Sequence, residues 1–363
     1  MARIVGAFVI AWLVATSLSS PVAGAAAGAA PAALDRVVAP LARAYVAKHG
    51  GQLSVGVTRG GRTTVLGYGG AAAQPDANYE IGSIGKTMAA LILAHAVVEG
   101  RVALQDDVRK YLDGDYPNLA FEGEPVRLLH LANMTSALPD NIPDLSAVPA
   151  LADKAAALRA YSKARFLSDL HAAKLTAKPG DQPAHSNVAA QLLAYVLEQV
   201  YGQPYETLLA RYVEDPLGMA KAGTGPLAVG HDETGAVAPW LDMPFSRPAG
   251  GLSYRAADML KYAAYQLAEP DAAVRLTHQG TWFTLDRKLS IGFFWIIGQT
   301  PTGGRRLRYS GGTYGFSSFC DLYPEDRLGV VLLSSVADPS AQDDLQALSE
   351  NLVAQLRAKA AGD

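Results

Sequence analysis

Segments with a strand-like pattern stand at both ends of this 363-residue chain, and the middle has few of them. Near the N-terminus, Leu53 to Thr58 and Thr63 to Tyr68 flank Gly60-Gly61, a pattern typical of a β-hairpin. From about Leu104 to Pro239 the chain is rich in Ala and Leu. Later strand signals cover Leu289 to Ile297, Leu307 to Gly311, Gly315 to Leu322 and Leu328 to Ser334. We therefore expect one sheet built from both ends of the chain, with a helical lobe inserted between its strands.

Apolar residues recur at helical spacing in several other segments. The expected helices are Ala33 to His49, a helix after Ser83 that ends at Gly100, Ala150 to Leu175, Ala189 to Val213, and Ala341 to Ala358. The expected fold class is α/β in the α+β sense, a sandwich of an antiparallel sheet of about five strands with helices on both faces. The inserted helical lobe covers about residues 104–239.

The first residues have the layout of a secretory signal peptide. Arg3 precedes an apolar run from Ile4 to Leu18, and Ala23 and Ala25 form an A-x-A cleavage pattern. The run is shorter than the roughly 20 residues that span a bilayer. We expect a signal peptide at 1–25, a linker at 26–34, and a periplasmic or secreted chain with no stable membrane span after cleavage. An uncleaved anchor is the alternative.

The charge balance argues against a nucleic-acid partner. Lys and Arg number 31, Asp and Glu number 34, and the net charge is -3, so a small molecule or peptide of little charge fits better as substrate. The single cysteine, Cys320, permits no intrachain disulfide and is expected in the core. The histidines lack metal-binding spacing, so we expect no metal and no cofactor. The sequence carries no signal for the oligomeric state.

Ser83 and Lys86 are the strongest candidates for chemistry. They stand three residues apart at an expected helix start, and residues at this spacing share a helix face. The first turn of a helix offers free N–H groups to a developing oxyanion. A neighbouring base is what a serine hydroxyl needs to become a nucleophile. Without further context, an N-cap serine beside a solvated lysine is the simpler interpretation.

Further segments supply that context. The stretch 79–87 (YEIGSIGKT) and 131–139 (LANMTSALP) are followed by Lys178-Pro179-Gly180, His185-Ser186-Asn187, and Tyr309-Ser310-Gly311-Gly312-Thr313. In this order they resemble the motifs of the β-lactamase-related serine hydrolases, which include class C β-lactamases, D,D-peptidases and esterases. The resemblance covers about residues 35–357, taken as one domain, and implies a β-lactamase/transpeptidase-like fold and an acyl-enzyme on Ser83, with Lys86 as base.

Two positions depart from the family pattern. His185 stands where the family usually has Tyr, and Tyr309 stands where it has Lys or His. The resemblance implies that His185 moves protons, and an imidazole can do so near neutral pH. Tyr309 supplies no cation, and strand alternation directs Arg306 and Arg308 to the opposite face. We therefore expect weak binding of anionic β-lactams. A buried histidine and a half-buried strand aromatic are the structural alternatives.

The resemblance also implies the remaining site residues. Asn187 would orient the substrate amide or Lys86, and Tyr309, Ser310, Gly311 and Gly312 would line the substrate site, with the Gly312 N–H as second oxyanion donor. If the exchange at 185 and 309 preserves a working contact, the two side chains should share a hydrogen bond or a partner.

We expect a serine hydrolase that acts on a peptide, amide or ester through an acyl-enzyme. A cell-wall-derived substrate follows by analogy of fold alone. An esterase for small neutral esters is the close competitor. A noncatalytic binding or regulatory protein of penicillin-binding type is the third possibility, and the intact Ser83 and Lys86 pair argues against it.

Overall fold

The computed structural model describes residues 24–70, 76–241 and 243–362. Its centre is an antiparallel sheet with the strand order β2-β1-β12-β11-β10-β9-β8-β7. Five strands have seven or eight residues: β1 (Leu53–Arg59), β2 (Arg62–Tyr68), β10 (Arg305–Gly312), β11 (Ser317–Tyr323) and β12 (Leu328–Ser334). Three short ones extend the sheet: β7 (Trp282–Phe283), β8 (Ser290–Ile291) and β9 (Ile296–Gln299). The five long strands confirm the expected sheet.

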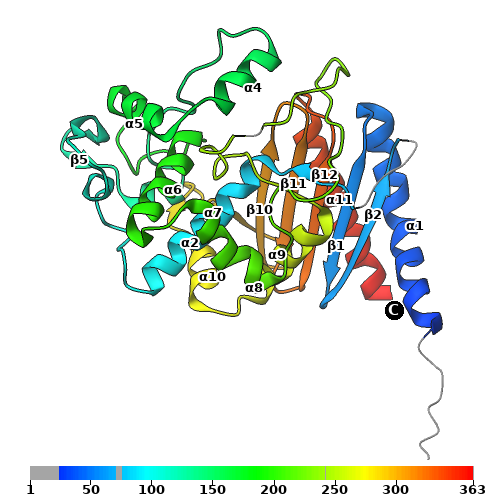
Figure 1. Ribbon diagram of the computed structural model, residues 1–363. Helices are drawn as coiled ribbons and strands as arrows, with labels where there is room; N and C mark the ends of the chain where they lie inside the picture. Colours follow the sequence, from blue (N-terminus) through cyan, green and yellow to red (C-terminus); the bar gives the residue numbers. More distant parts are fainter. Residues whose placement is uncertain (1–23, 71–75, 242, 363) are drawn as a thin grey trace, which may run out of the picture.

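The two ends of the chain meet in this sheet, as the sequence predicts. Strand β1 pairs with β12 in an antiparallel register that sets Leu53 opposite Ser334, so the first and last long strands are neighbours (Figure 1). Strands β1 and β2 form a hairpin around Gly60 and Gly61, whose φ angles of 55° and 84° suit the tight turns that hairpins favour. Cys320 is buried in β11, which confirms its expected place in the core.

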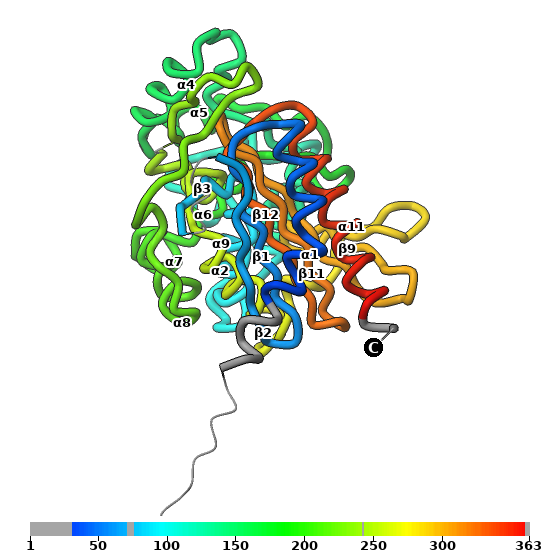
Figure 2. Tube along the Cα trace, turned by 90° about the vertical axis from the view of Figure 1, so that its right-hand side faces the viewer, coloured from blue at the N-terminus to red at the C-terminus, as the bar shows by residue number. Residues whose placement is uncertain are grey.

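Two terminal helices cover one face of the sheet. Helices α1 (Gly24–His49) and α11 (Ala341–Gly362) pack against each other and against the strands, as Figure 2 shows from the side. Their apolar side chains form one core layer with the sheet, including Val38 and Leu352. Helix α1 begins at Gly24, so the segment 26–34 is helical where the sequence predicted a linker. Most of the predicted signal peptide lies outside the described residues.

Helices α2 (Gly85–Val98) and α9 (Ala256–Ala268) belong to the layer on the other face. All of α2 from Gly85 to Ala94 is buried, because helices α6 (Asn187–Tyr201) and α10 (Ala272–Thr277) pack against it. A helix that is apolar on every side is suited only to such a central place. The larger core cluster of the molecule forms around this helix.

Seen from the sheet, most of the inserted lobe lies on the far side of α2 (Figure 1). Its helices are α3 (Leu128–Ala132), α4 (Leu151–Arg159), α5 (Lys163–Ala172), α6 (Asn187–Tyr201), α7 (Tyr205–Leu209) and α8 (Asp215–Leu217), with a π-helical turn at Ala210–Glu214. Short 3₁₀ turns stand at Val108–Tyr111 and Pro117–Leu119. Two small pairs of strands complete the fold, β3 (Tyr79–Glu80) with β6 (Ser253–Tyr254), and β4 (Ala120–Phe121) with β5 (Glu124–Pro125).

Three predicted elements are shorter in the structure than the sequence indicated. The helix predicted at 150–175 breaks where Ser162 caps α5 by accepting a hydrogen bond from the Arg165 N–H. The helix predicted at 189–213 breaks at Gly202, whose φ is 63°. The strand predicted at 289–297 divides into β8 and β9. In the described part of the chain, no helix is both long and apolar enough to cross a membrane.

Candidate active site

Ser83 lies in a 3₁₀ turn (Gly82–Ile84) that leads directly into α2. The turn is fixed to the sheet, because the Ser318 hydroxyl of β11 donates a hydrogen bond to the Ile81 carbonyl at 2.8 Å. Gly82 has a φ of 51°, and a Cβ added there would lie 2.5 Å from the Gly312 nitrogen. Only glycine therefore allows the nucleophile turn to approach β10 this closely.

The backbone nitrogens of Ser83 and Gly312 both lie where the turn meets β10. A Cβ added to Gly311 would lie 2.9 Å from the Ser83 nitrogen, so β10 runs directly beside the nucleophile. Alternate residues of an antiparallel strand direct their N–H groups to opposite sides. Because the Thr313 N–H donates to the Phe316 carbonyl of the neighbouring chain segment, the alternation directs the Gly312 N–H away from β11. The Gly312 nitrogen lies close to the turn, since it is the atom 2.5 Å from a Cβ added to Gly82.

Lys86 is completely buried, and its Nζ has three polar neighbours. It lies 2.6 Å from Ser83 Oγ, 2.6 Å from Asn187 Oδ1 and 2.5 Å from the Ala249 carbonyl oxygen. Burial lowers the pKa of Lys86 to about 7, against an opposing effect of the Asp140 charge. The amide and carbonyl oxygens can only accept hydrogen bonds. A neutral amine donates its two hydrogens to them and keeps its lone pair for the Ser83 hydroxyl.

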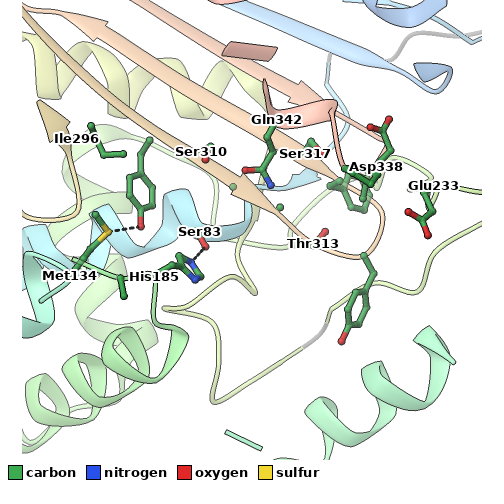
Figure 3. Close-up of a pocket in the computed structure, with 18 of the residues that line it drawn as sticks. Ser83, Met134, His185, Glu233, Ile296, Ser310, Thr313, Ser317, Asp338 and Gln342 are labelled. Atoms are coloured by element: carbon green, nitrogen blue, oxygen red, sulfur yellow. Dashed lines mark hydrogen bonds between the residues drawn. The ribbon is translucent and has the colours of Figure 1, made fainter. Parts of the chain in front are cut away.

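His185 also contacts the Ser83 hydroxyl, as the dashed line in Figure 3 shows. Its Nε2 lies 3.1 Å from Ser83 Oγ, and its Nδ1 lies 2.6 Å from Asp140 Oδ1. The hydrogen bond from His185 holds the pKa of Asp140 below its ordinary value. A carboxylate accepts the Nδ1 hydrogen, which leaves Nε2 of a neutral ring as the acceptor for Ser83. The side chain of His185 is 47% exposed, whereas Lys86 is enclosed.

The start of helix α6 holds the second motif in place. Ser186 caps the helix by accepting a hydrogen bond from the Ala189 N–H. Asn187 accepts a hydrogen bond from Lys86 with Oδ1, and its Nδ2 donates to Asn141 Oδ1 at 2.8 Å. Asn187 therefore contacts Lys86 directly, and its role in orienting Lys86 or the substrate amide stays a prediction. The sequence does not indicate Asp140, because this residue follows the 131–139 segment and contacts His185 only through the fold.

Tyr309 differs from the expectation that it shares a contact with His185. Its hydroxyl donates to Met134 Sδ at 3.5 Å, and the ring packs edge-on to Phe294 with centroids 6.2 Å apart. Burial raises the pKa of Tyr309 above its ordinary value. The two side chains share no hydrogen-bond partner among the described residues, because β10 directs Tyr309 to the apolar wall of the cavity. The expected pairing of positions 185 and 309 is therefore wrong.

Two of the three arginines of β10, Arg306 and Arg308, point away from the cavity, as strand alternation predicts. Arg306 pairs with Asp321 at 2.8 Å and with Glu350 of α11 at 2.8 Å. Arg308 lies 3.8 Å from the same Glu350 carboxylate. Both guanidinium groups are thus engaged on the face that α11 covers. Neither replaces the cation that position 309 lacks.

Ser83 lines two adjoining cavities of about 1220 Å³ and 430 Å³. Ser310, Gly311 and Gly312 line the larger one beside Ser83 and His185 (Figure 3). Its apolar wall consists of Met134, Trp282, Leu289, Ile291 and Ile296, and its acidic residues are Asp232, Glu233 and Asp338. Lys154 is the only Lys or Arg side chain among the described residues that line it. The described residues thus form a large cavity that Ser83 lines and that carries little positive charge.

Comparisons with solved structures define the class of this fold. A class C β-lactamase structure superimposes with a TM-score of 0.76 at 20% identity, over 90% of this chain and 97% of that chain. The β-lactamase/D-alanine carboxypeptidase of Pseudomonas syringae gives a TM-score of 0.74 at 18% identity, over 88% of this chain and 98% of that chain. The fold is therefore that of the class C β-lactamases and penicillin-binding proteins, as the sequence predicts.

Sequence comparison gives the family. The family model described as Beta-lactamase matches residues 38–355, so this chain belongs to the Beta-lactamase family. The D-alanyl-D-alanine-carboxypeptidase/endopeptidase AmpH of Escherichia coli is 28% identical over 284 residues, which cover 72% of this chain and 71% of AmpH. Protein flp of Staphylococcus aureus is 25% identical over 279 residues, covering 73% of this chain and 54% of that protein.

Proposed function

We propose that this protein is a serine hydrolase that forms an acyl-enzyme on Ser83. One observation carries the proposal: the Ser83 hydroxyl lies 2.6 Å from a fully buried amine whose pKa is lowered to about 7. A structural lysine gains nothing from such burial, because removing an ammonium from water is costly. A general base works best when its pKa lies near the pH at which it acts. Membership of the Beta-lactamase family supports the same conclusion.

The geometry supports a two-step reaction. Ser83 Oγ attacks the substrate carbonyl while Lys86 accepts the hydroxyl proton. The N–H groups of Ser83 and Gly312 stabilise the oxyanion of the tetrahedral intermediate. The leaving group departs with a proton that Lys86 passes on through His185, which contacts the same Oγ and lines the cavity. Water then hydrolyses the acyl-Ser83 ester and restores the free hydroxyl.

The favoured substrate is an ester or amide that carries no negative charge beside the scissile bond. The third-motif position holds Tyr309 with its hydroxyl on Met134, so no cation faces a substrate carboxylate there. The apolar wall around Ile291 and Ile296 suits an uncharged acyl or leaving group. Small neutral esters are therefore the first class to test.

A peptide from cell-wall material is the second candidate. The similarity to AmpH, which is named a D-alanyl-D-alanine-carboxypeptidase/endopeptidase, favours it. A carboxypeptidase substrate ends in a carboxylate, and Lys154 is the lining residue that could pair with it. If this candidate is right, a peptide ending in D-Ala-D-Ala should be cleaved faster than a neutral aryl ester, and Lys154→Ala should remove the preference.

Hydrolysis of p-nitrophenyl butyrate by Ser83 and Lys86 variants tests the proposal. Ser83→Ala and Lys86→Ala should each lower kcat/KM by roughly 10³-fold or more, because a nucleophile and its base act as one unit. Lys163→Ala serves as the matched control, since this exposed lysine lies in the lobe and pairs with Glu198. Activity that survives in Ser83→Ala would overturn the assignment.

The signal-peptide pattern supports an exported protein. Cleavage after Ala25 would release a chain that works in the periplasm or outside the cell, where cell-wall fragments and small esters are both accessible. N-terminal sequencing of the protein purified from its native host tests this placement. A mature N-terminus at residue 26 is expected, and a chain that retains residues 1–25 would contradict it.

A further inference from the structure

The apolar residues of the larger cavity lie together on one side of Ser83. In Figure 3, Ile296 and Met134 lie to one side of the serine, whereas Glu233 and Asp338 lie to the other. The cavity has a volume of about 1220 Å³, and pockets that hold drug-sized ligands measure roughly 300–1000 Å³. A small ester bound at Ser83 would therefore leave most of the apolar side in contact with water.

The apolar side of the cavity crosses the outer part of the sheet. Ile296 in β9 pairs with Ile291 in β8, and Ile291 pairs with Trp282 in β7. All three residues line the cavity. Among the described residues, β9 pairs with β10 only at 305–308, so it leaves uncovered the part of β10 that lies beside Ser83. We call this row of three residues the apolar wall.

The length of the apolar wall follows from the spacing of strands. Neighbouring strands lie about 4.8 Å apart, so the order β10-β9-β8-β7 spans about 14 Å. An extended backbone advances at most about 3.3–3.6 Å for its three bonds per residue, so a chain of single bonds that crosses the wall has about ten carbon atoms. Such a chain would contact Ile296 first and Ile291 next. Its end would reach Trp282.

We infer that the apolar wall binds a long apolar chain of the substrate, joined to the bond that Ser83 attacks. The inference rests on the proposed function and deepens it by naming the substrate class, an ester with a chain of about eight carbon atoms or more. The chain belongs to a fatty acid or to a fatty alcohol, which share this chemistry. The strand spacing and the separation of apolar from acidic residues in the cavity carry the inference.

Leu289 extends the apolar wall in the turn between β7 and β8. The Thr284 N–H donates a hydrogen bond to the Leu289 carbonyl at 2.9 Å, and the Leu289 N–H donates to the Thr284 hydroxyl at 3.1 Å. Leu289 lines the cavity, yet this residue is 37% exposed. An ordered turn thus holds an apolar side chain beside the cavity without burying it. A substrate chain would cover that side chain and remove it from water.

The hairpin of β7 and β8 is fixed beside the site and contains its own control residue. Trp282 Nε1 donates a hydrogen bond to the Asp181 carbonyl at 3.1 Å, so the hairpin is attached to the loop that leads to His185. Phe283, the next residue of β7, is 42% exposed and is not among the described residues that line the cavity. Successive residues of a strand point to opposite faces. Phe283 and Leu289 therefore have similar exposure but differ in their access to the cavity.

Two series of esters test the inference on the full chain. The acetate, butyrate and octanoate of p-nitrophenol lengthen the acid, and the ethyl, butyl and octyl esters of acetic acid lengthen the alcohol. All are used below the concentration at which they aggregate. In one series we expect kcat/KM to rise at least about 30-fold from the shortest to the longest ester, because each buried methylene strengthens binding. The series that shows the rise tells whether the chain belongs to the acid or to the alcohol.

Three variants of the hairpin separate the apolar wall from the rest of the surface. In Leu289→Gln, the ratio of kcat/KM between the longest and the shortest ester should fall at least about 5-fold. Leu289→Met keeps a flexible apolar side chain and should retain most of the ratio. Phe283→Gln should keep the wild-type ratio. A general disturbance of the hairpin would instead affect both Gln variants alike.

Binding of 1-octanol requires no hydrolysis and separates this inference from the proposed function. By calorimetry, the Kd of Leu289→Gln should be at least about 5-fold above that of wild type and of Phe283→Gln. If neither series shows a rise, or if both Gln variants lose the ratio equally, the inference is overturned, while acetate hydrolysis that depends on Ser83 still upholds the proposed function. If no ester is hydrolysed, the proposed function fails for esters. Equal binding of octanol by wild type and Leu289→Gln would then overturn the inference as well.

Discussion

Lys86 is unusual because its complete burial opposes the charge that a lysine normally carries. It is fully buried, and two of its three polar neighbours are oxygens with no hydrogen to offer. The third neighbour is the Ser83 hydroxyl at 2.6 Å. A neutral amine satisfies all three contacts at once, and in that state its lone pair faces the proton of the nucleophile. In the proposed mechanism, the burial of Lys86 is thus part of what activates Ser83.

The acylation rate should therefore follow the titration of Lys86. Its pKa is lowered to about 7, and the neutral form is the active one, so the rate should rise as pH increases through about 7 and then level off. This rise of the rate with pH should persist in His185→Gln, which removes the other candidate base. The measurement is first-turnover nitrophenolate release between pH 5 and 9. A rate that stays flat over this range, or that keeps rising with every unit up to pH 9, would contradict the assignment of Lys86.

The lowered pKa of Lys86 also makes the free energy of unfolding depend on pH. The folded-state pKa of Lys86 lies below its ordinary value of 10.5, so the unfolded chain binds more protons between about pH 7 and that value. The contribution of this group to the free energy of unfolding therefore rises as pH increases across that window. Replacing Lys86 with Met, which keeps the length and removes the charge, removes the rise.

We expect Tyr309 to determine the preference for charge at the proposed substrate site. We expect p-nitrophenyl butyrate to be hydrolysed with at least about 10-fold higher kcat/KM than the p-nitrophenyl monoester of succinic acid, which has the same acyl length but ends in a carboxylate. Penicillin-type β-lactams should be poor substrates for the same reason. The steady-state kinetics of this matched pair provide the measurement. Faster hydrolysis of the charged ester would show that another basic group, with Lys154 first, binds the carboxylate.

Strand β10 and the nucleophile turn (Gly82–Ile84) lie so close together that an added methyl group at Gly311 would collide with the backbone. A Cβ on Gly311 would lie 2.1 Å from the Ile81 carbonyl oxygen and 2.9 Å from the Ser83 nitrogen. A Cβ on Gly312 would lie 2.3 Å from Gln342 Nε2, which is the end of a flexible side chain. The two neighbouring glycines thus face obstacles of different kinds. The backbone of Ile81 and Ser83 cannot move aside without moving the Ser83 hydroxyl, whereas the side-chain amide of Gln342 can rotate.

Substituting each glycine with alanine tests this difference. Gly311→Ala should lower the free energy of unfolding by about 2 kcal/mol or more and reduce hydrolysis sharply, because it separates β10 from Ser83. Gly312→Ala should cost less than about 1 kcal/mol. Urea denaturation compares the two variants with wild type. Equal destabilisation by both substitutions would mean that the contact between β10 and the turn is not as close as described.

The elements that the sequence predicted best are those with a regular local pattern. The β1–β2 hairpin follows from Gly60-Gly61, and β12 follows from its continuous apolar run. The predicted helices were too long where a local cap intervened, as at Ser162 and Gly202. The split between β8 and β9 depends on tertiary contacts, including the hydrogen bond from the Phe294 N–H to the Ala132 carbonyl. No periodicity carries that information.

The residues of the candidate site also divide into those that a local sequence pattern predicts and those that depend on tertiary contacts. Ser83 and Lys86 were predictable because a spacing of three places both on one helix face. His185 and Asn187 required the resemblance to the family, since they lie about a hundred residues away. Asp140 was not found, because its contact with His185 depends on how a loop lies against a helix start. The contact predicted for Tyr309 was wrong, because the direction of a side chain into an apolar wall depends on packing.

At the scale of the whole molecule, the site forms where three distant parts of the chain meet. The nucleophile turn follows the first strands, Asp140 and His185 come from the inserted lobe, and Gly312 comes from a C-terminal strand. The sheet that joins the two chain ends fixes the first and third parts relative to each other. The lobe adds the second part through the hydrogen bond between Asn187 and Lys86. No part alone contains the complete site.

A noncatalytic binding protein could keep this architecture, so chemical reactivity at Ser83 is the central claim. Labelling with a fluorophosphonate tests it most directly, because the reagent modifies a serine only where the hydroxyl is activated. Wild-type protein should take up one equivalent, located by mass spectrometry on the peptide that contains Ser83, and Ser83→Ala should take up none. Equal labelling of folded Ser83→Ala, or no labelling of folded wild type, would contradict the account.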